Sequence, residues 1–373
     1  MSLRVDMIIL EYHPIVGGAQ RQLAMVAPLL QARGVELRIL TRRYAGLPAY
    51  EVVAGVPVHR LPAPGPKLTA ALSFTFSALA EIGRYPPDLI HAFSLFSPLS
   101  TAVAAKKRYG IPVAVKVLRG GAMGDVDRLR HKPFGARRLA SYRQQVDAFI
   151  TISQEIDAEL AAIGVPPARR VFVPNGVDLS RFSPLSPAAR QERRQQLGLP
   201  EGPLALFTGR LVPEKRVNHL LAVWPAVRQQ HPAATLLLLG DGPEAAALQQ
   251  QAGAGILFGG RVDDVDAYLP AADLFVLPSA TEGLSNSLLE AMAAGLPCLA
   301  TAVGGAPDII EHGRSGWLIP PDSLPDLQEA VITLLADTAV RQTLGARARQ
   351  KIVAEFGLDS TAEALHSLYM ALL

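Results

Sequence analysis

The sequence predicts an α/β protein built from two doubly wound parallel-sheet domains. Short apolar runs alternate with longer amphipathic segments along most of the chain, which is typical of a parallel sheet covered by helices. The 373 residues exceed the roughly 250–300 that one hydrophobic core usually holds. The apolar runs also fall into two series, separated by a Pro-Asn-Gly turn at residues 174–176.

Composition limits the class of protein. Hydrophobic residues make up 49% and charged residues 18% of the chain, as expected for a soluble globular protein. The net charge of +3 is too small to indicate a nucleic-acid partner. The single cysteine, Cys298, begins an apolar run and is predicted to be buried. No signal peptide or run of ~20 apolar residues is visible, so we expect a cytoplasmic protein, able to lie against the inner face of the membrane.

The strand candidates divide between the two domains. We predict an N-terminal domain over residues 1–176 and a C-terminal domain over 177–356, with a last helix at about 357–373 crossing back to the first. The first domain has apolar runs at 5–10, 36–40, 56–60, 89–92, 112–117, 148–152 and 170–173. The second has them at 204–208, 234–239, 256–258, 274–277, 298–301 and 316–319. Ligands of such sheets bind at the carboxyl ends of the strands, so the loops there carry the candidate sites.

The loop after the first strand holds Gly17 and Gly18 and leads into a helix predicted at 19–30. A glycine turn before a helix is either a tight connection or a contact for an anion or a sugar. The loop lacks the full Gly-x-Gly-x-x-Gly spacing, which counts against an NAD-dependent oxidoreductase.

A further helix is predicted at 68–85. Leu72, Phe76 and Leu79 recur on one of its faces, and we expect that face to pack on the first sheet. The alternative is a lip that receives an apolar acceptor.

The stretch 119–143 begins with a glycine-rich loop and is strongly basic. Its excess of arginine and lysine indicates either a solvated face or a peripheral contact with an anionic membrane surface. Asp125, in this stretch, and His91, at the end of an earlier strand, are candidate polar contacts for an acceptor. A structural role is the alternative for His91.

The second domain opens with a strand that ends at Gly209 and is followed by two cations, Arg210 and Lys215. Beyond the carboxyl end of a strand, these side chains could neutralise a diphosphate, Arg through two hydrogen bonds and Lys as a point charge. The alternative is a pair of solvated loop residues.

Residues 281–297 are the most informative stretch. Ser285 and its polar neighbours fit a helix N-cap, and apolar residues then recur at helical spacing. Gly283 permits a close approach, and the first free amides of the helix attract an anion. Glu282 and Glu290 would repel that anion, so they fit neutral hydroxyls better. A phosphate with hydroxylated rings on either side describes a nucleotide sugar. The alternative is a solvated acid before an ordinary amphipathic helix.

Two further loops lie at the same predicted edge. Asp241 stands between two glycines after the run 234–239, and Arg261 with Val262 follows the run 256–258. A loop backbone at the second position could hydrogen-bond the edge of a nucleobase.

Taken in order, these segments resemble the retaining glycosyltransferases of family four, which have the GT-B fold of two Rossmann-like domains facing a central cleft. The most specific marker is the pair Glu282 and Glu290 within EGLSNSLLEAMAAGLP. The segments GGAQRQL, VPNGVD, GRLVPEKR and AVGGAPDIIEHGRSGWLI agree in order, so the resemblance covers nearly the whole chain.

The resemblance implies a role for each candidate. Glu282, Arg210 and Lys215 would be the catalytic residues, with the two cations on the donor diphosphate and Glu282 on the transferred sugar. Glu290 would hold the ribose. The other donor contacts would be Gly17, Gly18, Gly209, Asp241, Arg261, Val262, Gly283, Leu284, Ser285 and Asn286. No metal or cofactor is expected, since the cations and the helix dipole neutralise the leaving diphosphate.

One departure from the family pattern concerns the catalytic base. Many members carry a histidine just after the strand that corresponds to 112–117, whereas this chain has Leu118 and Arg119 there. The base therefore stays open.

The function favoured by the resemblance is transfer of a hexose from a UDP- or GDP-sugar to a glycan or lipid-linked acceptor in cell-surface polysaccharide or glycolipid synthesis. The N-terminal domain would bind the acceptor and the C-terminal domain the donor. A sugar-nucleotide epimerase or hydrolase of the same fold, and a non-catalytic sugar-nucleotide-binding protein, are the alternatives.

Overall fold

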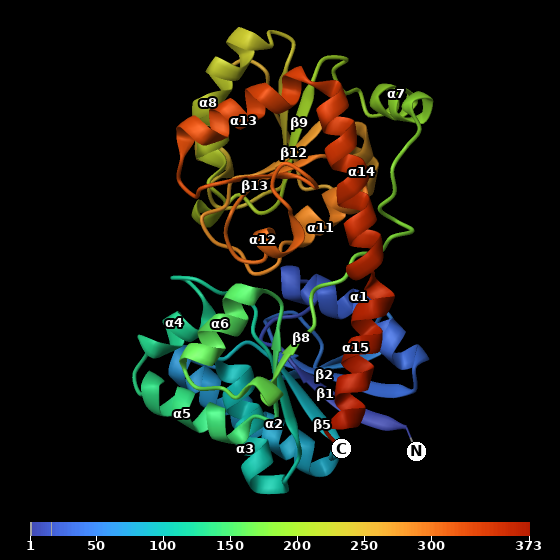
Figure 1. The fold of residues 1–373 in the computed structure, drawn as a ribbon. Coiled ribbons are helices and arrows are strands. Elements are labelled where there is room, and N and C mark those ends of the chain that lie inside the picture. Colours follow the sequence, from blue (N-terminus) through green and yellow to red (C-terminus); the bar gives the residue numbers. More distant parts are fainter. Residues whose placement is uncertain (1, 16) are drawn as a thin grey trace. The chain divides into compact units, whose positions relative to one another are not determined.

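The computed structural model describes residues 2–15 and 17–373, which divide into two compact units (Figure 1). Unit 1 comprises the chain up to Asn175 together with Leu358–Leu373, and unit 2 comprises Gly176–Gly357. Each unit is a mainly parallel sheet with covering helices, so the predicted fold class is confirmed.

Unit 1 holds an eight-stranded sheet in its described part, with the strand order β3-β4-β2-β1-β5-β6-β7-β8. The strands are β1 (Leu3–Ile8), β2 (Val35–Arg42), β3 (Tyr50–Val53), β4 (Val56–Leu61), β5 (Leu89–Phe93), β6 (Val113–Lys116), β7 (Ala148–Thr151) and β8 (Arg170–Phe172). Neighbours run parallel except for the antiparallel pair β3 and β4. The sequence did not predict β3, because this edge strand exposes Tyr50 and Val52 and has no continuous apolar run.

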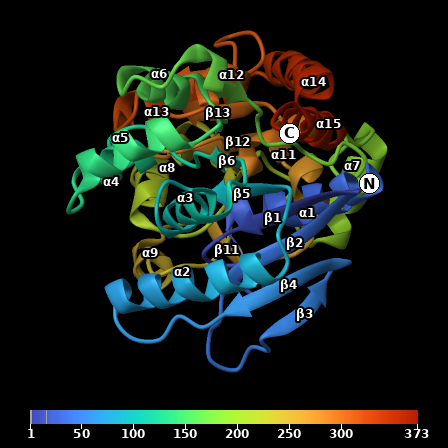
Figure 2. The same ribbon diagram turned by 90° about the horizontal axis from the view of Figure 1, so that it is seen from below.

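The helices of unit 1 are α1 (Gly18–Ala32), α2 (Lys67–Arg84), α3 (Ser97–Tyr109), α4 (Asp125–Arg130), α5 (Gly135–Gln145), α6 (Gln154–Ala162) and α15 (Leu358–Ala371), with a short 3-10 turn η1 (Pro167–Arg169). Leu30 of α1 and Leu365 and Tyr369 of α15 join one core cluster with side chains from one face of the sheet. Helices α2 and α3 pack beside each other outside that cluster (Figure 2).

The predicted packing face of α2 is wrong. Leu72 is 51% and Phe76 70% exposed, while Ala70, Phe74, Ala78 and Ile82 are buried. The helix carries two apolar stripes, and the one with the smaller residues faces the protein because alanine lets a helix approach its neighbours closely. A lip that receives an apolar acceptor therefore stays an open alternative for the exposed face with Leu72 and Phe76.

Unit 2 holds a parallel six-stranded sheet in the order β11-β10-β9-β12-β13-β14. The strands are β9 (Leu204–Thr208), β10 (Thr235–Leu239), β11 (Ile256–Gly260), β12 (Leu274–Leu277), β13 (Cys298–Thr301) and β14 (Trp317–Ile319). The helices are α7 (Pro187–Gln196), α8 (Val217–Gln230), α9 (Ala245–Gln251), α10 (Val265–Tyr268), α11 (Asn286–Ala293), α12 (Ala306–Ile309), α13 (Leu324–Ala336) and α14 (Thr338–Glu355), with 3-10 turns η2 (Pro213–Lys215) and η3 (Leu269–Ala271). Cys298 is buried, as predicted.

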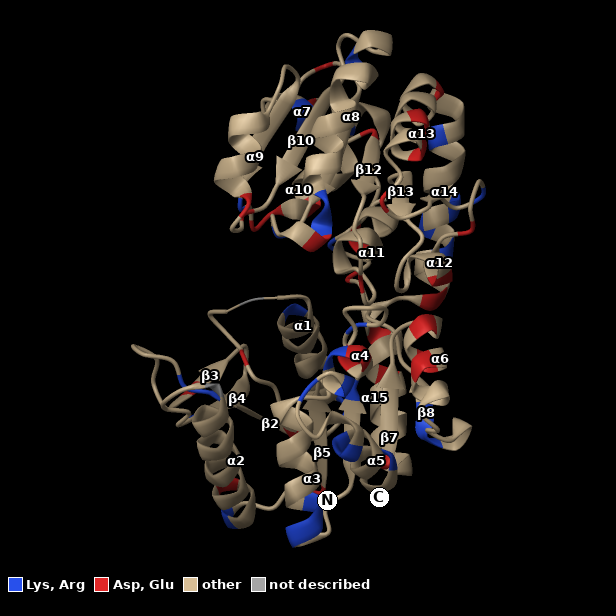
Figure 3. Cartoon of the chain, turned by 90° about the vertical axis from the view of Figure 1, so that its left-hand side faces the viewer, with Lys and Arg blue, Asp and Glu red and all other residues tan. Residues whose placement is uncertain are grey.

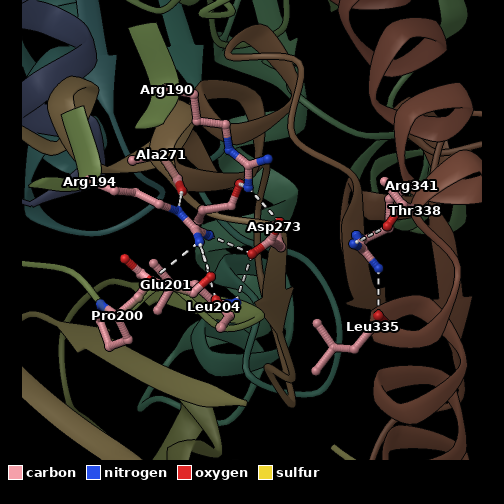
Figure 4. A network of polar contacts seen from close by, with 12 residues as sticks. Arg190, Arg194, Pro200, Glu201, Leu204, Ala271, Asp273, Leu335, Thr338 and Arg341 are labelled. Atoms are coloured by element: carbon pink, nitrogen blue, oxygen red, sulfur yellow. Dashed lines mark hydrogen bonds and ion pairs between the residues drawn. The ribbon is translucent and has the colours of Figure 1, made fainter. Parts of the chain in front are cut away.

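A charged clasp fixes α7 to the amino ends of β9 and β12. Figure 4 shows Arg190 and Arg194 of α7 converging on the carboxylate of Asp273, which also accepts from the amide of Leu204 at 2.8 Å. Burial alone would raise the pKa of Asp273, but the two guanidinium groups hold it below its usual value. In the same figure Arg341 closes the end of α13 by donating to the carbonyl of Leu335. These contacts stabilise the end of the sheet opposite the predicted site.

Candidate active site

The predicted cation and acid meet at the carboxyl edge of the unit 2 sheet. The Nζ of Lys215 lies 2.5 Å from Oε1 of Glu282, and the hydroxyl of Ser279 donates to the same oxygen at 2.6 Å. The side chains of Lys215 and Glu282 are only 16% and 13% exposed. Because so little water reaches the pair, the attraction between the two charges is screened less than at the surface.

Backbone hydrogen bonds hold the loops that carry Lys215 and Glu282 in these positions. The amide of Ala280 donates to the carbonyl of Glu214 at 2.8 Å, which ties the loop after β12 to the turn η2. Within η2 the amide of Lys215 donates to the carbonyl of Val212 at 2.9 Å. Lys215 and Glu282 are therefore positioned by the main chain as well as by their own attraction.

The start of α11 is built as the sequence predicts. Ser285 is the N-cap, and its hydroxyl accepts from the amide of Leu288 at 3.4 Å. The loop after β13 supports this start, because the amide of Gly305 donates to the carbonyl of Gly283 at 2.6 Å. Gly304 has φ +57°, and a Cβ there would lie 2.5 Å from the carbonyl oxygen of Glu282. Only glycine lets the two loops pack this closely.

The remaining residues of this segment follow the same construction. Gly283, Leu284 and Ser285 are buried and Asn286 is partly exposed, so the tip of α11 stays near the surface. Glu290 lies within α11 and is 4% exposed. Its role at a ribose stays a prediction.

The loops after β9 and β10 lie against each other. The amide of Gly209 donates to the carbonyl of Leu239 at 3.0 Å, and that of Leu211 to Asp241 at 2.9 Å. The carboxylate of Asp241 accepts from the next amide at 2.7 Å, which shapes its own turn. The guanidinium of Arg210 is exposed and has no hydrogen bond or ion pair within the described chain, so it is available to a ligand.

Strand order sets the sequence of these loops along the sheet edge. The loop with Arg261 and Val262 follows β11, Asp241 follows β10, Arg210 and Lys215 follow β9, and Glu282 follows β12. Arg261 is 70% exposed and lies 4.0 Å from the carboxylate of Asp263. Along this edge, the exposed loop with Arg261 is therefore followed by the loop with Arg210 and Lys215, and then by Glu282 just before α11.

The candidates in unit 1 are already engaged within the protein. The amide of Gly17 donates to the side chain of Gln20 at 3.1 Å, which closes the turn before α1 at Gly18. The ring of His91 is buried and its Nδ1 lies 2.6 Å from the hydroxyl of Tyr369. These contacts favour the tight turn for the glycines and the structural role for His91.

Asp125 also acts within the fold. Its carboxylate accepts from the amide of Leu118 at 3.2 Å, and its own amide donates to the carbonyl of Arg119 at 2.9 Å. Burial raises the pKa of Asp125 to about 6. The residue closes the glycine loop of the basic stretch, and direct contact with an acceptor stays a prediction.

Two residues at these sites gave no signal in the sequence. Ser279 follows β12 as an ordinary loop serine, and nothing in its neighbours predicts a bond to Glu282. Lys116 ends β6 and is buried, although its sequence context is that of any strand end. Across the described chain, no group of three His, Cys, Asp or Glu residues is placed to hold a metal. The expectation of metal-free chemistry stays a prediction.

Comparison with known proteins gives matches in both units. The family model for "Glycosyl transferases group 1" matches residues 202–337, and that for "Glycosyl transferase 4-like domain" matches residues 17–176. The 2-deoxystreptamine glucosyltransferase of Streptomyces kanamyceticus is 30% identical over 92% of this chain and 96% of its own. A GDP-mannose-dependent alpha-(1-6)-phosphatidylinositol monomannoside mannosyltransferase of Mycobacterium tuberculosis is 27% identical over 97% of both chains.

Solved structures match the fold over nearly the whole chain. Sucrose-phosphate synthase from Thermosynechococcus elongatus has a TM-score of 0.85 at 24% identity and covers 99% of both chains. The Anabaena HepE complex with UDP-glucose has a TM-score of 0.82 at 20% identity and covers 100% of both. At these identities the likeness establishes the fold.

Proposed function

We propose, from the premise that the chain belongs to the group 1 glycosyltransferases and has their GT-B fold, that it moves a hexose from a UDP- or GDP-sugar to a glycan or lipid-linked acceptor. The transfer retains the configuration of the anomeric carbon and serves the synthesis of a cell-surface polysaccharide or glycolipid. The observation that carries the proposal is the Lys215–Glu282 pair beside the N-terminus of α11.

Each part of this site suits one part of a nucleotide sugar. Lys215 and the exposed Arg210 supply two positive charges for a diphosphate, and the positive end of the α11 dipole adds to them. Lys215 lies against Oε1 of Glu282 and offsets its charge, and the other carboxylate oxygen can accept from sugar hydroxyls. Relatives named for GDP-mannose and for glucosyl transfer support a hexose donor.

The chemistry requires stabilisation of the leaving diphosphate. As the bond from C1 to the phosphate oxygen breaks, negative charge grows on that oxygen, next to fixed cations that need no rearrangement. The acceptor oxygen forms its bond to C1 on the same face, and its proton passes to the leaving phosphate oxygen. This route needs no protein base, which fits Leu118 and Arg119 at the usual histidine position and the internal bonding of His91.

A ligand screen followed by rate measurements tests the site. UDP, GDP, ADP and their hexoses are compared by thermal shift, because the nucleotide that binds the folded state raises its melting temperature. With that donor, Lys215→Ala and Glu282→Gln should each slow transfer by on the order of 100-fold or more. Arg314→Ala, an exposed charge elsewhere in unit 2, is the control. A Lys215→Ala, Glu282→Gln double variant that transfers at the parental rate would place the reaction elsewhere.

Product analysis separates the alternatives. The anomeric configuration of donor and product, read by NMR, should be the same, and an inverted product would contradict retention. Without acceptor, only slow hydrolysis of the donor is expected. Rapid epimerisation or hydrolysis of the nucleotide sugar would replace the transferase assignment of this site.

We also propose that the stretch 119–143 contacts an anionic membrane surface. Phe134 lies within it at 72% exposure and φ +58°, and Arg130, Lys132 and Arg137 are exposed nearby in sequence. An aromatic ring among basic side chains suits the interface, where each cation can add about 1 kcal/mol. No helix in residues 2–15 and 17–373 is long and apolar enough to cross a bilayer.

Vesicle co-sedimentation tests this contact. The parent should sediment with phosphatidylglycerol vesicles but not with phosphatidylcholine vesicles, and Phe134→Ser should weaken the binding. Phe172→Ser, which alters another exposed aromatic residue of unit 1, is the matched control. Equal recovery of the parent with both vesicle types would contradict the proposal.

A further inference from the structure

We propose that Lys116 of unit 1 binds an anionic group, a phosphate or a carboxylate, carried by the acceptor. The identification of the carrier as the acceptor rests on the proposed function. The anion site itself is argued from unit 1 alone.

Lys116 occupies the part of the sheet where a ligand would bind. It is the last residue of β6, at the carboxyl edge, and pairs in register with Phe93 of β5 and Ile150 of β7. The strand order reverses between β1 and β5, since β2 lies beyond β1 on one side and β6 beyond β5 on the other. Ligands of doubly wound sheets bind at the carboxyl edge beside such a reversal.

The side chain is a buried cation without a counter-ion. Lys116 is 5% exposed, and within the described chain its ammonium makes no hydrogen bond or ion pair. The other sheltered lysines have carboxylate partners, with Lys106 on Asp147 and Lys215 on Glu282. A buried charge is normally paired, because removal from water penalises it.

The ammonium nevertheless keeps its proton at neutral pH. Burial lowers the pKa of Lys116 to about 8, which still lies above 7. The group is thus a positive charge with unused donors, and an anion is the ligand that would satisfy both. Binding of an anion would move the pKa back towards its ordinary value.

Neighbouring groups add hydrogen-bonding capacity without adding charge. Burial, and then the charge of Lys116, lower the pKa of His91 to about 3, so this ring is neutral. Burial raises the pKa of Tyr369, whose hydroxyl therefore keeps its proton and can donate to Nδ1 of His91. When Tyr369 is the donor, the ring hydrogen of His91 lies on Nε2, which is buried and has no partner in the described chain. A second donor thus lies close enough to Lys116 for the two to interact.

Two further features mark the same region. The hydroxyl of Tyr12, which follows β1, is buried and has no hydrogen-bond partner among the described residues. Ser94, which follows β5, has φ +81° and donates its amide to the carbonyl of Lys116 at 2.9 Å. A strained non-glycine residue is retained where the surroundings hold it, often at a binding site. The carboxyl edge therefore combines an unpaired cation, unused polar atoms and local strain.

The experiment follows each lysine separately in the full-length protein. The chain has seven lysines, so ¹³Cε-lysine labelling gives few signals, and Lys116→Arg assigns the one of interest. Its pH titration is recorded alone, with glycerol phosphate, with glucuronate and with neutral glucose. We expect the Lys116 pKa to rise by about one unit or more with at least one anion, which corresponds to about tenfold preference for the charged form. Glucose should leave it unchanged.

The two anions distinguish the source of the negative charge. A response to glycerol phosphate alone indicates an acceptor phosphate, and a response to glucuronate alone indicates an acidic sugar. An unchanged Lys116 titration with both anions would overturn the proposal. Lys215 provides the separate readout for the donor site, because its signal should respond to the nucleotide found by thermal shift. Failure of that response would remove the proposed function without deciding the anion site.

Kinetics give a second readout once transfer to an anionic acceptor is measured. Lys116→Met should raise the acceptor KM by on the order of tenfold, the loss of one charge-assisted contact, and leave the donor KM unchanged. Lys107→Met, which alters an exposed lysine of α3, is the matched control. Equal changes in both KM values would indicate a general structural effect and contradict binding at Lys116.

Discussion

Replacing Lys116 by methionine should make unit 1 more stable at neutral pH. Methionine has a similar length and no charge, so it fills the same space without the penalty of a buried ammonium. The native lysine is buried and carries no partner in the described chain. The variant thus removes an unfavourable term and leaves the surrounding core in place.

The size and sign follow from the pKa. Burial lowers it from 10.5 to about 8, a change of about 2.5 units, and one unit corresponds to 1.36 kcal/mol, so the penalty is about 3 kcal/mol. Between pH 8 and 10.5 the unfolded chain binds more protons than the folded chain at this residue. The penalty is therefore complete below pH 8 and disappears as the pH rises through 10.5. Lys116→Met should gain about 3 kcal/mol at pH 7 and almost nothing near pH 10.5.

Urea unfolding can assign this gain to unit 1. Both tryptophans, Trp224 and Trp317, lie in unit 2, so their fluorescence follows unit 2 while far-UV circular dichroism follows both units. Lys116→Met should shift the unfolding of unit 1, which circular dichroism detects and tryptophan fluorescence does not. The fluorescence transition of unit 2 should stay unchanged. Lys132→Met, which alters an exposed lysine, should change stability by less than about 0.5 kcal/mol. A Lys116→Met protein less stable than the parent at pH 7, or one with an equal gain at pH 10.5, would refute the reasoning.

Three other changes test separate features. Burial raises the pKa of Asp125 from 3.8 to about 6, so the parent should lose about 3 kcal/mol of stability relative to Asp125→Asn as the pH rises from 3 to 7. A difference in urea unfolding that stays constant over this range would contradict the prediction. Gly304→Ala should lower both the melting temperature and the affinity for nucleotide, because its Cβ would lie 2.5 Å from the Glu282 carbonyl oxygen. Unchanged nucleotide binding by calorimetry would show that the loop adjusts freely. Asp273→Ala should lower the stability of unit 2 by about 3–5 kcal/mol, because Arg190 and Arg194 lose their carboxylate partner. Tryptophan fluorescence during urea unfolding measures this loss. A loss under 1 kcal/mol would contradict the stabilising role of these ion pairs.

The fold was predictable where strands are buried on both faces. Continuous apolar runs give β9 and β12 their observed limits, because a parallel strand between two helical layers needs apolar residues at every position. Strand β3 escaped prediction since an edge strand needs no such run. The packing face of α2 was mistaken because two apolar stripes compete, and only the neighbours of the helix decide between Phe74 and Phe76.

The candidate site was predictable in its chemistry and not in its contacts. Residue types and their positions after strands place Lys215 and Glu282 at one sheet edge. Their ion pair depends on a backbone bond between two loops, which the sequence does not reveal. Ser279 and Lys116 escaped attention because their importance comes from burial and from missing or particular partners, and these appear only in three dimensions.

The placement of α15 determines the order in which the protein can mature on the ribosome. Residues up to Asn175 emerge before unit 2, yet Leu365 and Tyr369, which join the core of unit 1, are synthesised after it. Tyr369 also bonds to His91. Unit 2 is a single uninterrupted segment, so all of it leaves the exit tunnel before unit 1 has its final helix. Until α15 is made, part of the apolar sheet of unit 1 therefore stays uncovered. A chain that ends at Gly357 would lack the helix that covers it.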